Sequence, residues 1–150
     1  MILSDSTIYE IAENLDAGMR CFVHQKTNDI KIIPDSLNPQ WFDIDNDIWK
    51  EDCDEIENNR TDYLEIKPFD SHEAFKIMAD FSEIIDNKKL QNRLIRALNQ
   101  QKPFKHFKDE INDTDDYRQQ WFEYKKNRLI EFIYKQLANH SAFENNDKNC

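Results

Sequence analysis

Residues 19–33 read MRCFVHQKTNDIKII, and this stretch decides the fold class of the chain. Met19–Gln25 is rich in β-branched and aromatic residues, which favour strands, and Ile30–Ile33 repeats that character. Thr27-Asn28-Asp29 between them is typical of a turn. The stretch therefore predicts an antiparallel β-hairpin, which Pro34 closes because proline cannot donate to a strand ladder.

The regions on either side of the hairpin extend this prediction. Before it, Ile8, Ile11, Ala12 and Leu15 recur at the spacing of one helical face, which predicts a helix over Thr7–Ala17. Gly18 suits the left-handed position that ends such a helix. After it, Tyr63–Lys67 is predicted as a third strand, stopped by Pro68. The three strands would form one small antiparallel sheet.

The rest of the chain is predicted to be helical. Asp70 or Ser71 can cap a helix whose apolar face carries Ala74, Phe75, Met78, Phe81 and Ile85. Further helices are predicted over Lys88–Leu98, Phe104–Ile111 and from Thr114 or Asp115 to about Asn139. We expect an α+β fold with an N-terminal helix, about three antiparallel strands and C-terminal helices packed on one face of the sheet. Residues 1–140 would form a single domain and residues 141–150 a disordered tail.

Composition excludes several classes of function. The only glycine is Gly18, so the phosphate-binding P-loop, the dinucleotide fingerprint and the GxSxG elbow are all absent. Three scattered cysteines and four scattered histidines show no metal-ligand spacing. No apolar stretch approaches the roughly 20 residues of a membrane span, and the N-terminus has acids where a signal peptide is basic. We expect a cytoplasmic protein without membrane contact, metal, cofactor or catalytic residues.

The charge distribution is the most informative feature. The formal net charge is -10, yet the segment from Lys88 to Lys108 contains seven lysines and arginines and no acid. Cations neutralise phosphates, and aromatic rings offer stacking faces to unpaired bases. We therefore predict a non-catalytic binding protein that holds RNA or single-stranded nucleic acid. The candidate ligand-binding residues are Arg93, Arg96, Lys102, Phe104, Lys105, Phe107 and Lys108.

Other interpretations of the same residues remain open. Phe104 and Phe107 could instead belong to the core, with the cations facing an acidic protein partner. The acidic region from Asp43 to Asp62 predicts a short amphipathic helix carrying Trp49, Cys53 and Ile56. That region and the long C-terminal helix suggest a protein-interaction or regulatory module, with a homodimer as one form.

Asp43, Asp45 and Asp47 resemble a calcium loop, but Ile48 stands where glycine is needed, so a solvated acidic face is the better interpretation. An enzyme would need a pocket assembled by the fold.

Several short motifs resemble a known family. They are Arg96-Ala97-Leu98-Asn99, Lys102-Pro103-Phe104, Phe107-Lys108, Trp121-Phe122 and Lys125, together with Ile11-Ala12, Met19–Phe22 and Tyr63–Ile66. With these motifs the chain resembles the small bacterial proteins of uncharacterised protein family 0158, from about Ile8 to Leu137. The family often has glycine where this chain has Gln100-Gln101. The resemblance concerns membership alone, and no activity, cofactor or site is carried over from it.

Overall fold

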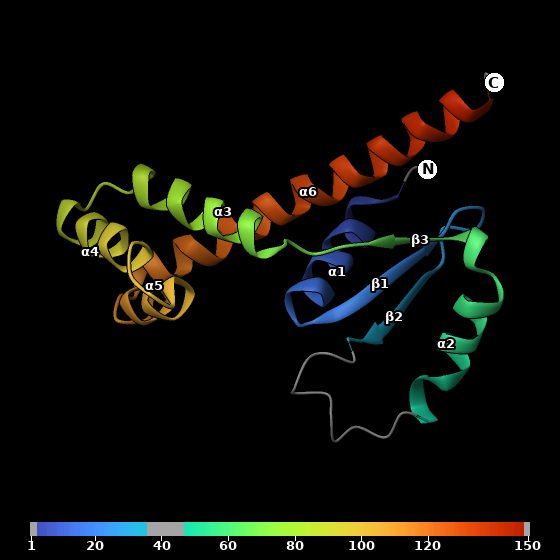
Figure 1. The fold of residues 1–150 in the computed structure, drawn as a ribbon, viewed down its shortest axis with the longest axis horizontal. Coiled ribbons are helices and arrows are strands. Elements are labelled where there is room, and N and C mark those ends of the chain that lie inside the picture. Colours follow the sequence, from blue (N-terminus) through green and yellow to red (C-terminus); the bar gives the residue numbers. More distant parts are fainter. Residues whose placement is uncertain (1–2, 36–46, 149–150) are drawn as a thin grey trace. The chain divides into compact units, whose positions relative to one another are not determined.

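The computed structural model describes residues 3–35 and 47–148 of the chain. It has the predicted α+β class, with an N-terminal helix, a three-stranded antiparallel sheet and several C-terminal helices (Figure 1). The elements in chain order are α1 (Asp5–Asp16), β1 (Met19–His24), β2 (Ile30–Pro34), α2 (Asp47–Asn58), the 3-10 helix η2 (Arg60–Asp62), β3 (Tyr63–Ile66), α3 (Ser71–Ile84), α4 (Lys88–Leu98), α5 (Pro103–Asn112) and α6 (Asp116–Lys148).

Contacts within the chain group these elements into two compact units. The first unit contains the residues up to Pro68 together with those from Ile130 onward, and the second unit is Phe69–Leu129. Each unit has its own buried residues and is described by itself. Our assignment of residues 1–140 to a single domain stays a prediction.

The predicted hairpin lies at the centre of the first unit. The strand order is β2-β1-β3, and both pairings are antiparallel. Gly18 ends α1 with φ 88°, in the left-handed region where glycine carries no steric cost. Alternate residues of β1 point to opposite faces of the sheet. Cys21 and Val23 are completely buried, and the Cys21 thiol lies 4.0 Å from the Ile11 carbonyl oxygen of α1.

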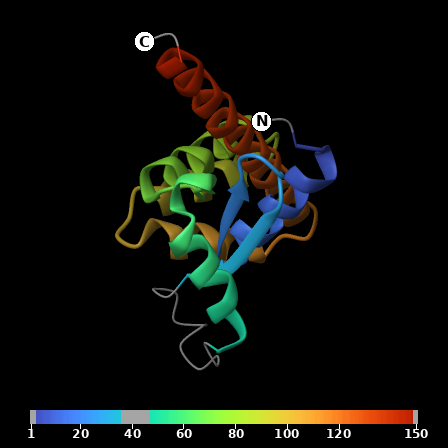
Figure 2. The same ribbon diagram turned by 90° about the vertical axis from the view of Figure 1, so that its right-hand side faces the viewer.

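Helix α2 covers part of the other face of the sheet. Phe22, Ile33 and Tyr63 of the strands form a buried cluster with Ile56 of α2, and Cys53 packs against it. Figure 2 shows α1 and α2 on opposite sides of the strands. The amphipathic helix predicted within the acidic region is therefore confirmed.

The C-terminal part of α6 completes the first unit. The Gln136 side chain accepts from the Lys67 amide at 2.9 Å and donates to the Lys67 carbonyl oxygen at 2.8 Å. Ile133 and Leu137, which lie within three residues of Gln136 in the sequence, are buried. Helix α6 continues to Lys148, whereas we expected it to end near Asn139 and be followed by a disordered tail. The sequence after Asn139 has neither proline nor glycine to stop the helix.

The second unit is built from α3, α4, α5 and the first part of α6 around an aromatic core. Trp121 lies between two rings, with its centroid 4.9 Å from that of Phe107 and 5.3 Å from that of Phe81. The other buried members are Ile77, Met78, Ile85, Leu90, Leu94, Leu98 and Ile111. Phe75, which we placed on the core face of α3, is 37% exposed. The buried stripe of α3 runs through Ile77, Met78, Phe81 and Ser82 instead.

One residue of the turn between α4 and α5 adopts an unfavourable backbone conformation. Lys102 has φ 55° and ψ 56°, the left-handed region that costs a residue with a Cβ atom about 1 kcal/mol or more. Replacing Lys102 by glycine is expected to raise the free energy of unfolding by about 0.5–1 kcal/mol, since the steric gain exceeds the entropic cost of glycine. Chemical denaturation measures the change. Lys102→Ala keeps the Cβ atom and removes the same charge, so an equal gain in both variants would contradict this account.

Candidate nucleic-acid interface

Helix α4 turns its cations outward because its apolar side chains occupy one face. Leu90, Leu94, Ala97 and Leu98 are buried in the second unit, at the spacing of a helical stripe. Asn87 begins the helix by accepting from the amide of Leu90. Arg93 and Arg96 lie outside this stripe and are exposed.

Helix α5 likewise has a buried apolar side, and its cations are exposed. Phe107 and Ile111 are its buried residues, four positions apart. Lys105 and Lys108 lie outside that buried side and are exposed, as is Lys102 at the N-terminus of the helix. Pro103 suits the first turn of α5, because backbone N–H groups there have no acceptor within the helix. Proline, which lacks the N–H, therefore loses no helical hydrogen bond at this position.

The two helices pack against each other, and residues of both line one hollow. A hollow of about 130 Å³ is lined by Arg93, Arg96, Ala97 and Gln100 on one side and by His106 and Glu110 on the other. Arg93 Nε lies 3.5 Å from Glu110 Oε2. This partly exposed ion pair contributes little stability but holds the Arg93 guanidinium at the hollow.

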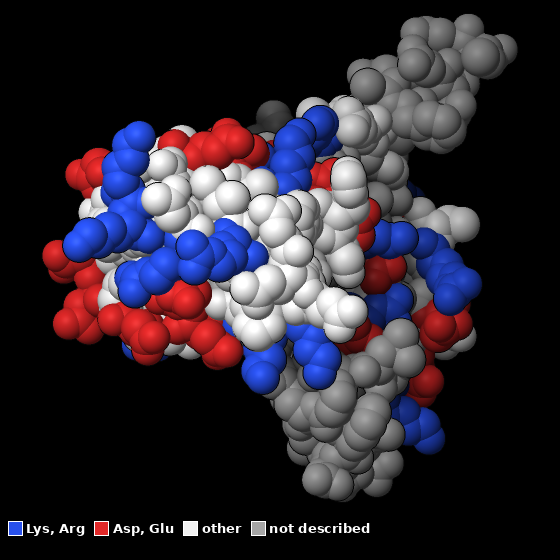
Figure 3. All heavy atoms as spheres, turned by 60° about the vertical axis from the view of Figure 1, so that its left-hand side comes forward, with Lys and Arg blue, Asp and Glu red and all other residues white. Residues whose placement is uncertain are grey.

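We call five exposed cations of α4 and of α5 with its N-cap residue the basic surface: Arg93, Arg96, Lys102, Lys105 and Lys108. Within residues 3–35 and 47–148, Arg93 alone among them has an ion pair with a carboxylate. Figure 3, which brings the side of α4 and α5 forward, shows lysine and arginine side chains gathered there with acidic side chains along their borders. Such unpaired exposed cations are available to an anionic ligand.

The two aromatic candidates lie in different surroundings. Phe107 is 0% exposed and packs on Trp121, so it belongs to the core, which is the alternative that the sequence left open. Phe104 is partly buried and packs against the same core. His106, absent from our candidate list, lines the hollow and is half-buried. Its position next to the two lysines of α5 was a signal that could have identified it.

The acidic region offers no comparable site in the part of the chain that is described. Asp43 and Asp45, the first carboxylates of the calcium-like run, lie outside the described residues. Asp52 and Glu55 each lie 3.3 Å from the Lys31 ammonium, so their charges are partly satisfied within the first unit. Among the described residues no group of three or more histidines, cysteines or carboxylates could hold a metal ion.

The surroundings of Cys21 and His24 favour structural roles for both residues. Burial raises the pKa of the Cys21 thiol to about 12, and a thiol that stays protonated is a poor nucleophile. His24 Nδ1 accepts from the amides of Lys26 and Thr27 and so holds the hairpin turn.

None of the helices in the described ranges has a stretch both long and apolar enough to cross a membrane.

Among the described side chains of the long helix α6, two rings are exposed, and they bear on the homodimer alternative. Phe122 is 46% exposed and Tyr134 is 43% exposed. The Arg118 guanidinium lies 5.4 Å from the Phe122 ring centre, and the Tyr134 hydroxyl donates to Asp5 at 2.7 Å. Because each ring already has a neighbour within its own unit, the homodimer stays a prediction.

A comparison with models of protein families identifies the family of this chain. The model of the Uncharacterised protein family (UPF0158) matches residues 22–147, and the chain belongs to this family. It is similar to UPF0158 protein PA5073 of Pseudomonas aeruginosa, with 30% identity over 77 residues. That match covers 51% of this chain and 50% of the relative, so the chain matches about half of the relative's length. No solved structure matches the chain.

Proposed function

We propose that this protein binds RNA or single-stranded nucleic acid through the basic surface of α4 and α5. The observation that carries the proposal is the convergence of Arg93, Arg96 and His106 on one hollow in a chain of net charge -10. Exposed guanidinium and ammonium groups are the side chains that contact phosphates. The net charge of -10 opposes contact of a polyanion with acidic parts of the surface, so we expect contact mainly at the basic surface.

The burial of the aromatic candidates decides which part of a nucleic acid we expect the protein to contact. Phe107 is buried in the core, so its ring cannot stack on a base. Contacts from the basic surface would therefore go mainly to the phosphate backbone, which carries no sequence information. We propose binding with little sequence preference and without catalysis.

Salt dependence tests this proposal. Each phosphate neutralised on a single strand contributes a slope of about −0.7 to a plot of log binding constant against log salt concentration. We expect a slope of about −3.5 if all five cations of the basic surface meet phosphates, and about −2 if three do. Fluorescence anisotropy of a labelled mixed-sequence RNA measures it. Absence of binding at low salt would exclude the proposal and leave a protein partner, and a slope near zero would also contradict it.

A further inference from the structure

A second hollow lies on the sheet of the first unit and shares no residue with the basic surface. It has a volume of about 330 Å³ and is lined by Arg20, Phe22, Ile56, Arg60, Tyr63 and Glu65. We call it the sheet hollow. Small-molecule sites in proteins typically have volumes of about 300–1,000 Å³, so the sheet hollow reaches the lower end of that range. All six residues belong to the first unit.

Strand register explains why these side chains meet. Phe22 pairs with Glu65 of β3 on one side and with Lys31 of β2 on the other. Arg20 lies two positions before Phe22 and therefore shares its face of the sheet. Helix α2 covers the β2 side of that face, where Lys31 binds its carboxylates. The part of the face over β1 and β3 is left as the sheet hollow.

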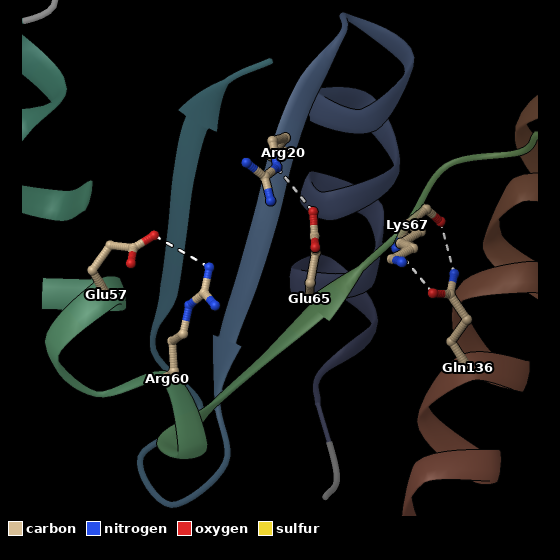
Figure 4. A network of polar contacts seen from close by, with 6 residues as sticks. All are labelled: Arg20, Glu57, Arg60, Glu65, Lys67 and Gln136. Atoms are coloured by element: carbon tan, nitrogen blue, oxygen red, sulfur yellow. Dashed lines mark hydrogen bonds and ion pairs between the residues drawn. The ribbon is translucent and has the colours of Figure 1, made fainter. Parts of the chain in front are cut away.

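The floor of the sheet hollow is apolar and its rim carries two guanidinium groups. Phe22, Ile56 and Tyr63 belong to one buried hydrophobic cluster. The Arg20 guanidinium lies 5.1 Å from the Phe22 ring centre, and Arg20 Nε donates to Glu65 Oε1 at 2.9 Å. Figure 4 shows Arg60 extending from η2 along the same face on which Arg20 and Glu65 lie.

Both arginines keep donors for a further partner. Arg60 Nη2 lies 3.3 Å from Glu57 Oε1, and in the described part of the chain each guanidinium uses a single nitrogen in its ion pair. A guanidinium has five N–H donors in a planar fork that matches a carboxylate or a phosphate. Glu65 orients Arg20 over the floor and also repels any anion that approaches from its own side. The remaining donors therefore favour an anion on the Arg60 side.

We propose that the sheet hollow binds a small organic anion. Its carboxylate or phosphate group is held by Arg20 and Arg60, and its apolar ring or chain lies on the floor formed by Phe22, Ile56 and Tyr63. Two charged donors over an apolar floor are the combination that selects an anion with an apolar part over inorganic phosphate. This site is independent of the basic surface, because the two share no residue and belong to different units.

Titration of the ¹⁵N-labelled full chain with small probes tests the site. Phenyl phosphate and benzoate share the proposed chemistry and differ in the anionic group, and benzyl alcohol is a neutral match. We expect at least one of the two anions to cause saturable amide shifts in β1 and β3, and benzyl alcohol to bind about tenfold more weakly or worse, because charged hydrogen bonds are lost. The comparison of the two anions identifies the preferred group.

Arginine variants locate the binding. The Arg60 side chain is 75% exposed, so Arg60→Gln removes one surface ion pair and should leave the thermal melt unchanged. We expect it to weaken probe binding about tenfold, and Arg20→Gln to do the same. Arg118→Gln is the matched control, because Arg118 also stacks on a phenylalanine but lies in the second unit. Absence of saturable shifts with either anion, equal binding of benzyl alcohol, or wild-type affinity in folded Arg60→Gln would overturn the proposal.

Discussion

A variant that carries Arg96→Glu, Lys102→Glu and Lys105→Glu is expected to bind mixed-sequence single-stranded RNA at least about 100-fold more weakly than the wild type at low salt. Three lost phosphate contacts remove about 2 from the salt slope, and at tens of millimolar salt this alone corresponds to a loss of that size. Reversing the charges adds repulsion. All three side chains are exposed, and none has an ion pair in the described ranges, so the fold should persist.

A matched variant separates the position of the charges from their number. Lys26, Lys50 and Lys135 are exposed lysines outside α4 and α5. Replacing them by glutamate changes the formal charge by the same −6 as the first variant, from -10 to −16. We expect this control to lose far less affinity, because long-range repulsion between exposed charges is screened by salt. Equal losses in the two variants would show that net charge, rather than the basic surface, governs binding.

Phe107→Ala is expected to lower the free energy of unfolding by about 3–5 kcal/mol, the usual cost of removing a buried ring. Phe107 is 0% exposed and lies against Trp121 in the core of the second unit. A cavity there would also disturb Leu94 and Ile111, which belong to the same cluster. Urea denaturation followed by circular dichroism and tryptophan fluorescence measures the loss.

Phe75→Ala is the control for this core prediction. The Phe75 ring is 37% exposed, so its removal should cost about 1 kcal/mol or less. If Phe107→Ala were as mild as Phe75→Ala, the Phe107 ring would not be a core residue. The prediction that Phe107 stacks on bases would then be supported again.

The secondary structure followed from local patterns that physical chemistry constrains strongly. The hairpin over residues 19–33 combined strand-forming residues with turn chemistry, and β1 and β2 begin at Met19 and Ile30 as predicted. The helix Lys88–Leu98 has the predicted bounds, because Asn87 caps it and its leucines recur at helical spacing. The family resemblance that rested on short motifs is confirmed by the match over residues 22–147.

Other features depended on contacts that a local pattern does not contain. Phe75 and Ile77 both lie near the apolar stripe of α3, and only tertiary packing decides that Ile77 is the buried one. The pairing of Arg93 with Glu110 arises from the packing of α4 on α5. The sheet hollow joins residues of β1, α2, η2 and β3, so no short motif could have indicated it.

The measurement that most directly tests the basic surface is a residue-level map of the RNA contact. The ¹⁵N-labelled full chain would be titrated with a short mixed-sequence single-stranded RNA at low salt, and amide shifts would be followed for every assigned residue. The account predicts saturable shifts concentrated at Arg93, Arg96, Lys102, Lys105 and Lys108 and at their neighbours in α4 and α5, with the β1 and β2 signals unchanged. Saturable shifts confined to the first unit, or no shifts at any RNA concentration, would contradict it.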